Sequence, residues 1–302
     1  TLCVRSDRFY KRIIRSGELG FSEGYIEGDW TTNNLEALLY QLIKHRKAIE
    51  DALYAHSATL LYARCVSYLK SLTPTNTLAS APANIRHHYD IGNDLYVQML
   101  GSTMQYTCAY YHRPGMTLDE AQQAKMRLVA KKLNLRPGMR VLDIGCGFGA
   151  LGFLLASQYG VRVVGVTLSK RQVMYAKKHY VHPHLDVRYQ DYRDVPRGTG
   201  FDRIYSIGMF EHVGKRQYGE YFAKCDRLLK PQGLMLLHTI GTHNRDARVQ
   251  DNTTFVGKYI FPEGQIPHVS SLTNETDTWY LEDWQNFGLS YAKTLRAWHH
   301  NL

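Results

Sequence analysis

The stretch Val141-Leu142-Asp143-Ile144-Gly145-Cys146-Gly147-Phe148-Gly149 decides the fold of this chain of 302 residues. Its apolar first part predicts a buried strand at Arg140–Ile144, and its glycines lead into a helix expected from Gly149 to Tyr159. Glycines let a backbone approach a ligand closely, and a helix N-terminus offers free N–H groups to a carboxylate or phosphate. Ligands of open α/β sheets bind at this end of the strands. The stretch therefore predicts a strand–loop–helix unit that holds a small ligand.

Short apolar strands alternate with helices on both sides of this loop. We expect the other strands at Val161–Val166, Leu185–Tyr189, Arg203–Ile207 and Leu234–His238, with a further strand near Trp279–Phe287. We expect the other helices at 117–133, 169–181 and 215–229, the first opened by the capping box Thr117-Leu118-Asp119-Glu120, and a turn at Lys230–Gly233. Such alternation predicts an α/β fold with a parallel, doubly wound sheet and helices on both faces.

Two details indicate S-adenosylmethionine (SAM) as the ligand. Asp143 precedes the first glycine by two residues, where a carboxylate can bind the ammonium group of a methionine moiety. The next strand ends in Val166-Thr167-Leu168-Ser169, without the acidic residue that binds the ribose of NAD. A dinucleotide site and a glycine turn without ligand remain as alternatives, because Gly145-x-Gly147-x-x-Ala150 also fits the relaxed nicotinamide pattern. The sheet is thus expected to be that of a class I, Rossmann-like SAM methyltransferase.

The first part of the chain has a different pattern. Residues 1–72 predict a small, mainly helical N-terminal domain, with helices at Asn34–Ile43 and from about Ala48 to Leu72. The polar, proline-containing residues 73–84 predict a linker, and residues 85–302 the catalytic domain.

Composition excludes several classes of protein. The net charge is +10, which suits an anionic membrane surface or a nucleic acid, but no nucleic-acid-binding motif is present. The five cysteines are scattered and the histidines lack ligand spacing, so we predict neither a disulfide framework nor a metal site. No apolar run is long enough for a membrane span, and because no apolar signal region follows Thr1 we expect neither secretion nor membrane insertion. We therefore expect a cytoplasmic protein.

Further motifs stand in order along the chain. They are Tyr89-Asp90-Ile91-Gly92-Asn93-Asp94-Leu95-Tyr96, Tyr106-Thr107-Cys108-Ala109-Tyr110-Tyr111, Gly165-Val166-Thr167-Leu168-Ser169, Gln190-Asp191-Tyr192-Arg193-Asp194, Ser206-Ile207-Gly208-Met209-Phe210-Glu211-His212-Val213-Gly214, Leu237-His238-Thr239-Ile240-Gly241, Tyr259-Ile260-Phe261-Pro262-Glu263-Gly264 and Tyr291-Ala292-Lys293-Thr294-Leu295. With the glycine loop, this series resembles the cyclopropane-fatty-acid synthase family. The N-terminal stretch from Leu19 to Trp30 is similar to the bacterial members that modify phospholipids.

The resemblance implies a reaction and its reagents. A methylene group derived from the SAM methyl is added across a cis double bond of an acyl chain in a membrane phospholipid. An isolated alkene is a weak nucleophile, so the methyl group must be held in line with the π bond. The carbocation that forms must be shielded from water until a base, in this family a bicarbonate ion, removes a proton and the ring closes.

The resemblance also assigns residues to roles. For bicarbonate and catalysis it implies Cys108, Glu211, His238, Tyr291 and the backbone of Ile240. For SAM, the loop and the resemblance together imply Tyr106, Thr107, Asp143, Gly145, Cys146, Gly147, Thr167, Leu168, Gln172, Tyr192 and Arg193. Simpler interpretations stand beside these, since Cys108 could be a small buried hydrophobic residue and Glu211 a carboxylate favoured at a helix start.

The implied setting is the inner face of the membrane, where the protein binds peripherally to anionic, unsaturated phospholipids. The resemblance also allows a homodimer. Because related synthases continue beyond Leu302, we expect the catalytic domain to be truncated at its C-terminus. Three alternatives follow: a homologue that binds SAM or lipid with little activity, an enzyme that forms a methyl branch, and a small-molecule methyltransferase on the same scaffold.

Overall fold

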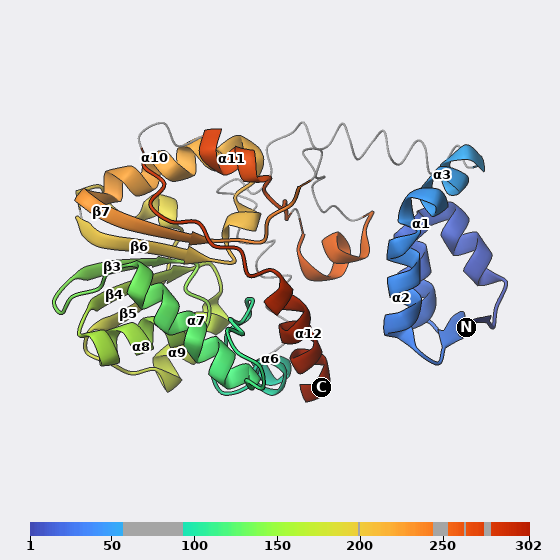
Figure 1. Ribbon diagram of the computed structural model, residues 1–302, viewed down its shortest axis with the longest axis horizontal. Coiled ribbons are helices and arrows are strands. Elements are labelled where there is room, and N and C mark those ends of the chain that lie inside the picture. Colours follow the sequence, from blue (N-terminus) through green and yellow to red (C-terminus); the bar gives the residue numbers. More distant parts are fainter. Residues whose placement is uncertain (57–92, 199, 244–252, 263, 275–278) are drawn as a thin grey trace. The chain divides into compact units, whose positions relative to one another are not determined.

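The chain divides into two compact units in a computed structural model (Figure 1). One unit comprises Thr1–Pro74 with Arg248–Gly264, and the other Thr75–Ala247 with Gln265–Leu302. The structure describes residues 1–56, 93–198, 200–243, 253–262, 264–274 and 279–302. The predicted linker at 73–84, the first residues of the predicted catalytic domain and the motif that begins at Tyr89 lie outside the described residues.

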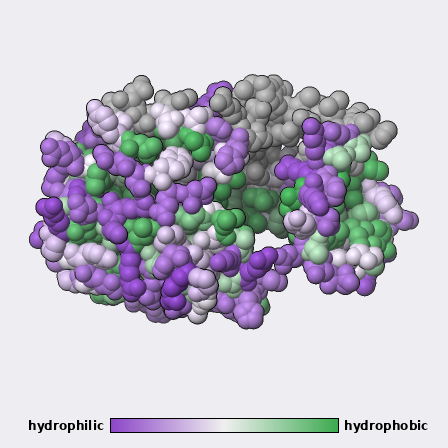
Figure 2. Space-filling model, in the orientation of Figure 1, coloured by the Kyte–Doolittle hydropathy of each residue, from purple (hydrophilic) through white to green (hydrophobic). Residues whose placement is uncertain are grey.

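The N-terminal unit is mainly helical, with a two-stranded sheet that the sequence analysis missed. Its elements are β1 (Leu2–Val4), α1 (Arg8–Ile26), β2 (Trp30–Thr32), α2 (Leu35–Lys44) and α3 (Arg46–His56). The Trp30 side chain is 1% exposed and its indole N–H donates to the carbonyl of Phe21 at 2.8 Å. Helix α2 begins where the sequence predicts it, since the Asn34 side chain accepts from the Ala37 N–H. Hydrophobic side chains also reach the surface of this unit (Figure 2).

Residues 253–262 are grouped with this unit although they stand far along the chain. The Glu23 carboxylate on α1 accepts from Lys258 Nζ at 2.6 Å and from the Tyr259 hydroxyl at 2.7 Å. Lys258 and Tyr259 lie within a π-helical turn at Val256–Ile260. The grouping differs from the contiguous catalytic domain that we predicted from residue 85 onward.

The second unit is built on a parallel sheet of the order β5-β4-β3-β6-β7. Its strands are β3 (Arg140–Ile144), β4 (Arg162–Thr167), β5 (Leu185–Tyr189), β6 (Phe201–Ile207) and β7 (Leu229–His238). Its α-helices are α6 (Asn93–Leu100), α7 (Leu118–Lys132), α8 (Ala150–Tyr159), α9 (Lys170–His179), α10 (Tyr218–Leu228), α11 (Val269–Asn274) and α12 (Leu289–Asn301). The predicted α/β fold with helices on both faces is confirmed.

Side chains that alternate along the strands build two cores. Leu142 and Ile204 pack with α10 on one face, while Val141 and Tyr205 pack with α7 and α8 on the other. Figure 1 shows α10 and α11 on one side of the sheet and α7, α8 and α9 on the other. Because both faces are covered, the ends of the strands are where a site can form.

Two predicted features at the end of the sheet are wrong. The turn expected at Lys230–Gly233 is part of β7, whose pairing with β6 shifts between Phe201 and Arg203 so that the extra residues bulge out of the ladder. The stretch near Trp279–Phe287 forms no strand among its described residues and leads to α12 without regular secondary structure. Among the described strands, β7 therefore forms one edge of the sheet.

Within the described residues, no helix combines the length and apolar character needed to span a bilayer. The same residues contain no cluster of three or more histidine, cysteine or acidic side chains that could hold a metal ion.

Candidate active site

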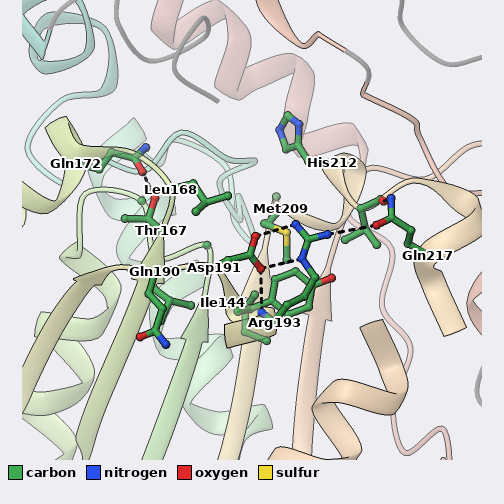
Figure 3. A pocket seen from close by; sticks show the side chains of 16 residues that line it. Ile144, Thr167, Leu168, Gln172, Gln190, Asp191, Arg193, Met209, His212 and Gln217 are labelled. Carbon is green, nitrogen blue, oxygen red and sulfur yellow. Dashed lines mark hydrogen bonds and ion pairs between the residues drawn. The ribbon is translucent and has the colours of Figure 1, made fainter. Parts of the chain in front are cut away.

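A pocket opens at the carboxyl ends of β3, β4, β5 and β6 (Figure 3). Its empty volume of about 790 Å³, which includes space open to solvent, lies in the range of small-molecule sites. It is lined by Ile144, Gly145, Gly147, Val166, Thr167, Leu168, Gln172, Gln190, Asp191, Tyr192, Arg193, Gly208, Met209, His212, Val213 and Gln217.

The glycine loop forms one wall of the pocket. The N–H groups of Gly145 and Cys146 donate to the carbonyl of Val166 at 2.9 and 3.1 Å, which joins the loop to β4. Gly145 has a φ of +82°, and a Cβ atom there would lie 2.7 Å from the Cβ of Met209. Only glycine combines this left-handed backbone with so close a neighbour.

Polar groups face the pocket from the next two strand ends. After β4, the buried Thr167 hydroxyl donates to Gln172 Oε1 at 2.7 Å. After β5, the Asp191 carboxylate accepts from the Arg193 guanidinium at 2.7 and 2.9 Å, and Arg193 also reaches Gln217. Figure 3 shows Asp191 and Arg193 turned toward each other. The pocket thus offers a hydroxyl–amide pair (Thr167 and Gln172) at one place and an ion pair (Asp191 and Arg193) at another.

Seven of the residues predicted to bind SAM line this pocket. They are Gly145, Gly147, Thr167, Leu168, Gln172, Tyr192 and Arg193. The other four predicted residues, Tyr106, Thr107, Asp143 and Cys146, are not among its lining residues.

Asp143 points into the interior of the sheet. Its carboxylate accepts a hydrogen bond from the Tyr205 hydroxyl at 2.7 Å, and its side chain is almost fully buried. Burial raises the pKa of Asp143 to about 7, although the Tyr205 hydrogen bond opposes the shift. In this structure, the group predicted to meet the methionine ammonium is held by a tyrosine on β6.

The predicted catalytic glutamate follows β6. Glu211 lies in the 3₁₀ turn Phe210–His212, and its Oε1 accepts from the Ile240 N–H at 2.8 Å. Its Oε2 is buried and has no hydrogen-bond partner among the described residues. Burial raises the pKa of Glu211, while the Ile240 hydrogen bond lowers it. The Ile240 N–H, which we predicted to bind the anion, is thus occupied by the glutamate.

His238 ends β7, beside this glutamate turn. Its carbonyl accepts from the N–H of Gly208, which lines the pocket. Its ring stacks on Phe287 with 5.3 Å between the ring centres, and its buried Nδ1 has no partner in the described part of the chain. Burial lowers the pKa of His238 to about 3, and the charge of Lys125 adds to this effect. The imidazole is therefore neutral.

Cys108 is held between two helices. From α7, the Gln122 side-chain amide donates to the carbonyls of Gln105 and Thr107. From α12, the Thr294 hydroxyl accepts from the Ala109 N–H at 3.0 Å. Burial raises the pKa of the Cys108 thiol.

Tyr291 on α12 belongs to the same neighbourhood. Burial raises its pKa, and the negative charges that Tyr106, Glu211 and Cys108 can carry raise it further. Four of the five predicted catalytic positions are therefore connected by contact or charge: Glu211 to Ile240, and Tyr291 to Glu211 and Cys108.

Some pocket residues were missed from the predicted site. Gln190, Asp191, Met209 and His212 line the pocket, and each stands within a motif quoted above. They follow the carboxyl ends of β5 and β6, so the rule on ligand sites in open sheets could have identified them. Gln217 lies in none of the quoted motifs and does not directly follow a strand, so no sequence pattern identifies it.

The chain is similar to several known proteins. Residues 76–302 match the family model described as mycolic acid cyclopropane synthetase. The cyclopropane-fatty-acyl-phospholipid synthase of Escherichia coli (strain K12) is 42% identical over 299 residues, covering 98% of this chain and 75% of that protein. Among solved structures, the cyclopropane synthase MmaA2 from Mycobacterium tuberculosis is 35% identical with a TM-score of 0.67, over 73% of this chain and 82% of that one. Mycolic acid cyclopropane synthase CmaA1, solved with SAH and CTAB, is 34% identical with a TM-score of 0.66, over the same shares.

Proposed function

The chain belongs to the mycolic acid cyclopropane synthetase family of SAM-dependent enzymes, and we propose that it adds a methylene group from SAM across the cis double bond of an unsaturated acyl chain in a membrane phospholipid. Membership confirms the resemblance that the motifs predicted. The phospholipid substrate is supported by the name of the E. coli relative, whose sequence matches this chain over almost its full length, the N-terminal unit included.

In this proposal SAM occupies the pocket at the strand ends. The Thr167–Gln172 pair binds the ribose hydroxyls in place of an acidic residue, since both side chains carry donors and acceptors. The loop at Gly145 and Gly147 lies against the methionine part, and Tyr192 against the adenine. The task of the pocket in this proposal is to bind SAM and orient its methyl group.

Bound SAM supplies the electrophilic methyl group, and bound bicarbonate supplies the base that accepts the proton lost as the ring closes. The chain's own residues hold these reagents and exclude water. Around Tyr291, the aromatic rings of Tyr106 and Trp298 form an apolar wall. The faces of such rings can stabilise a developing carbocation, by about 1–2 kcal/mol each when desolvated.

A single observation carries the bicarbonate part of the proposal. Glu211 Oε2 and His238 Nδ1 are both buried and both lack a hydrogen-bond partner among the described residues. Buried polar atoms are rarely left in this state, so an unsatisfied pair at one sheet end indicates a polar ligand. A hydrogen-carbonate ion fits this pair, because its hydroxyl can donate to the glutamate and its oxygens can accept from a histidine N–H and the Tyr291 hydroxyl.

The test combines labelled SAM with vesicles of a monounsaturated phospholipid, followed by mass spectrometry of the extracted acyl chains. We expect each modified chain to gain one CH₂ unit and to lose its double bond, with a rate that rises on adding bicarbonate to CO₂-depleted buffer. A Glu211→Gln variant should bind SAM normally but turn over at least about 100-fold more slowly, since its one amide oxygen accepts from the Ile240 N–H and its NH₂ group cannot accept from the anion's hydroxyl. A methyl branch in place of a ring, or label in a small amine only, would contradict the proposal.

We further propose that the enzyme works at an anionic membrane surface on the cytoplasmic side. The N-terminal unit supports this with α2, whose Tyr40 and Ile43 are 61% and 71% exposed and are followed by Lys44 on the same helix and Lys47 at the start of α3. Exposed apolar residues beside lysines suit a shallow, charge-assisted contact with lipid headgroups. Sedimentation with anionic vesicles should be weakened by the change Ile43→Ser, while zwitterionic vesicles should bind little of either protein. Equal binding of both proteins to both kinds of vesicle would contradict this role of α2.

A further inference from the structure

Lys125 is a buried cation that none of the roles above uses. It lies on α7 and is 2% exposed, and its Nζ donates to the Thr107 hydroxyl at 2.6 Å. No carboxylate among the described residues forms an ion pair with it. Lysines are almost never fully buried unless they are paired, because an unpaired ammonium loses its hydration without compensation.

The ammonium group contacts Thr107, the residue that directly precedes Cys108 in the chain. Its positive charge lowers the pKa of the Cys108 thiol, against the effect of burial, and lowers the pKa of His238. Its partner Thr107 faces the pocket wall, because a Cβ atom on the pocket-lining Gly208 would lie 2.5 Å from Thr107 Cγ2. The charge of Lys125 therefore acts on Cys108 and His238, and its hydrogen bond holds Thr107 beside the pocket wall.

A purely structural role does not account for this lysine. Gln122, one turn earlier on α7, already holds the Thr107 segment through its carbonyls. A methionine could fill the same space without the cost of burying a charge. That cost is considerable, since burial lowers the pKa of Lys125 to about 7, so that near neutral pH about half of the unliganded molecules carry the charge. A bound anion favours the charged form. The charge itself is the part that needs an explanation.

The groups proposed to bind the anion supply hydrogen bonds but no positive charge. His238 is neutral, Tyr291 is a phenol and Glu211 is acidic. Building on the proposed function, we propose that Lys125 is a positioning residue whose buried ammonium supplies the positive charge that retains bicarbonate between Cys108 and His238. It acts on the bound ion through the local field and through the orientation of Thr107.

The test compares Lys125→Met with Lys125→Arg and with Lys131→Met, which changes an exposed lysine on the same helix. For each protein, the rate with unsaturated vesicles is measured against bicarbonate concentration in CO₂-depleted buffer, and SAM binding is measured by equilibrium dialysis. In Lys125→Met we expect the half-saturating bicarbonate concentration to rise by at least about tenfold, with SAM affinity changed by less than about threefold. Lys125→Arg should recover most of the loss, and Lys131→Met should match the wild type.

Stability without bicarbonate gives an independent measurement. If the charge serves a ligand, Lys125→Met should unfold at the same denaturant concentration as the wild type or a higher one. A clearly less stable or unfolded Lys125→Met chain would assign the lysine to the structure and overturn the proposal.

Other outcomes are equally decisive. Weaker SAM binding with unchanged bicarbonate dependence would place the charge at the methionine carboxylate and overturn the proposal. If the rates of the wild type and of Lys125→Met depended on bicarbonate concentration in the same way, the role proposed for Lys125 would be overturned. The proposal that bicarbonate is the base would still stand. A wild type that shows no response to bicarbonate would overturn the proposed base together with the role proposed for Lys125.

Discussion

Gly145 shows how much of the pocket depends on one residue. Replacing it by alanine puts a Cβ atom at a φ of +82° and 2.7 Å from Met209. The left-handed backbone alone costs an L-residue about 1–3 kcal/mol, and the contact forces Met209 away from the pocket wall. We expect Gly145→Ala to lower the free energy of unfolding by at least this amount and the SAM affinity by at least about tenfold, measured by denaturant unfolding and equilibrium dialysis.

Gly138 provides the matched control. Its φ is +83°, and a Cβ atom there would meet nothing within 4 Å. Gly138→Ala should therefore show the backbone cost without the loss of SAM affinity. Equal SAM affinities in the two variants would mean that the Gly145–Met209 contact does not shape the site.

Two partly exposed histidines, His212 after β6 and His238 at the end of β7, predict a loss of stability in acid. Burial lowers the pKa of His238 to about 3 and that of His212 to about 4, from an ordinary value of 6.5. Below pH 6.5 these histidines bind protons in the unfolded chain but not in the folded chain. The free energy of unfolding therefore falls as the pH drops from 6.5 toward 4. At pH 5 each ring contributes at most about 2 kcal/mol to this loss.

Denaturant unfolding at pH 7 and pH 5 measures the effect. His238→Asn removes one of the two rings, so it should lose less stability between these pH values than the wild type. His299→Asn, which changes an exposed ring at the end of α12, should lose as much as the wild type. An unchanged loss in His238→Asn would show that this ring is protonated in the folded protein.

At the residue scale, the sequence could predict which chain positions lie near the pocket. It was a weaker guide to the direction in which each side chain points. Thr167 and Gln172 follow a predicted strand end, and both line the pocket. Asp143 stands inside β3, opposite Tyr205 on β6, so its side chain shares the face of that tyrosine. The direction of the Asp143 side chain is decided by the pairing register of β3 and β6, and a single sequence does not give that register. Lys125 was missed for a related reason, since helical periodicity does not reveal a buried cation.

Helix α12 positions the cysteine segment. The Thr294 side chain is fully buried, accepts from the Ala109 N–H at 3.0 Å and donates to the Ser290 carbonyl at 2.9 Å. Thr294→Val keeps the volume but leaves the Ala109 N–H buried without a partner. We expect a loss of about 1–3 kcal/mol in unfolding free energy. Turnover of unsaturated phospholipid should also fall, because Cys108 loses its anchor.

Thr294→Ser is the control, since it keeps the hydroxyl and removes only a methyl group. It should retain the hydrogen bond to Ala109 and most of the turnover. If valine and serine variants lost activity equally, the methyl group and not the hydroxyl would position the segment.

At the scale of elements, strand positions were the most predictable feature. Arg140–Ile144 and Leu185–Tyr189 were predicted with the bounds that the structure shows, the first as a largely apolar run and the second as an alternation of apolar and polar residues. The bulge at Lys230–Gly233 has the composition of a turn, and only its pairing with β6 makes it part of β7. The stretch near Trp279–Phe287 is long enough for a strand but has no partner strand among the described residues.

The molecule as a whole is not assembled from contiguous domains. A boundary was predicted from the linker composition alone, and composition cannot show that residues 253–262 return to the N-terminal unit. The contacts that bring them back join α1 to a stretch more than 200 residues later, at Lys258 and Tyr259. Such contacts depend on how the whole chain folds, and no local sequence pattern predicts them.

Glu23 on α1 accepts hydrogen bonds from Lys258 and Tyr259 of the later segment, so its replacement should loosen that segment. In Glu23→Gln the charge that pairs with Lys258 is lost and the hydrogen bond from Tyr259 is weakened. We expect the backbone amides of residues 253–262 to exchange with deuterium faster than in the wild type, as measured by mass spectrometry. Glu27→Gln, an exposed change one turn later on the same stretch, should leave their exchange unchanged.

The pH dependence of that difference identifies its cause. The hydrogen bonds from Lys258 and Tyr259 hold the pKa of Glu23 below its ordinary value. The carboxylate therefore contributes its full stability above that ordinary value and loses it as the pH falls through the lowered pKa. The ratio of exchange rates between Glu23→Gln and the wild type should be largest near neutral pH and approach one in acid. A ratio that stays constant with pH would mean that packing, and not the glutamate charge, keeps residues 253–262 in the N-terminal unit.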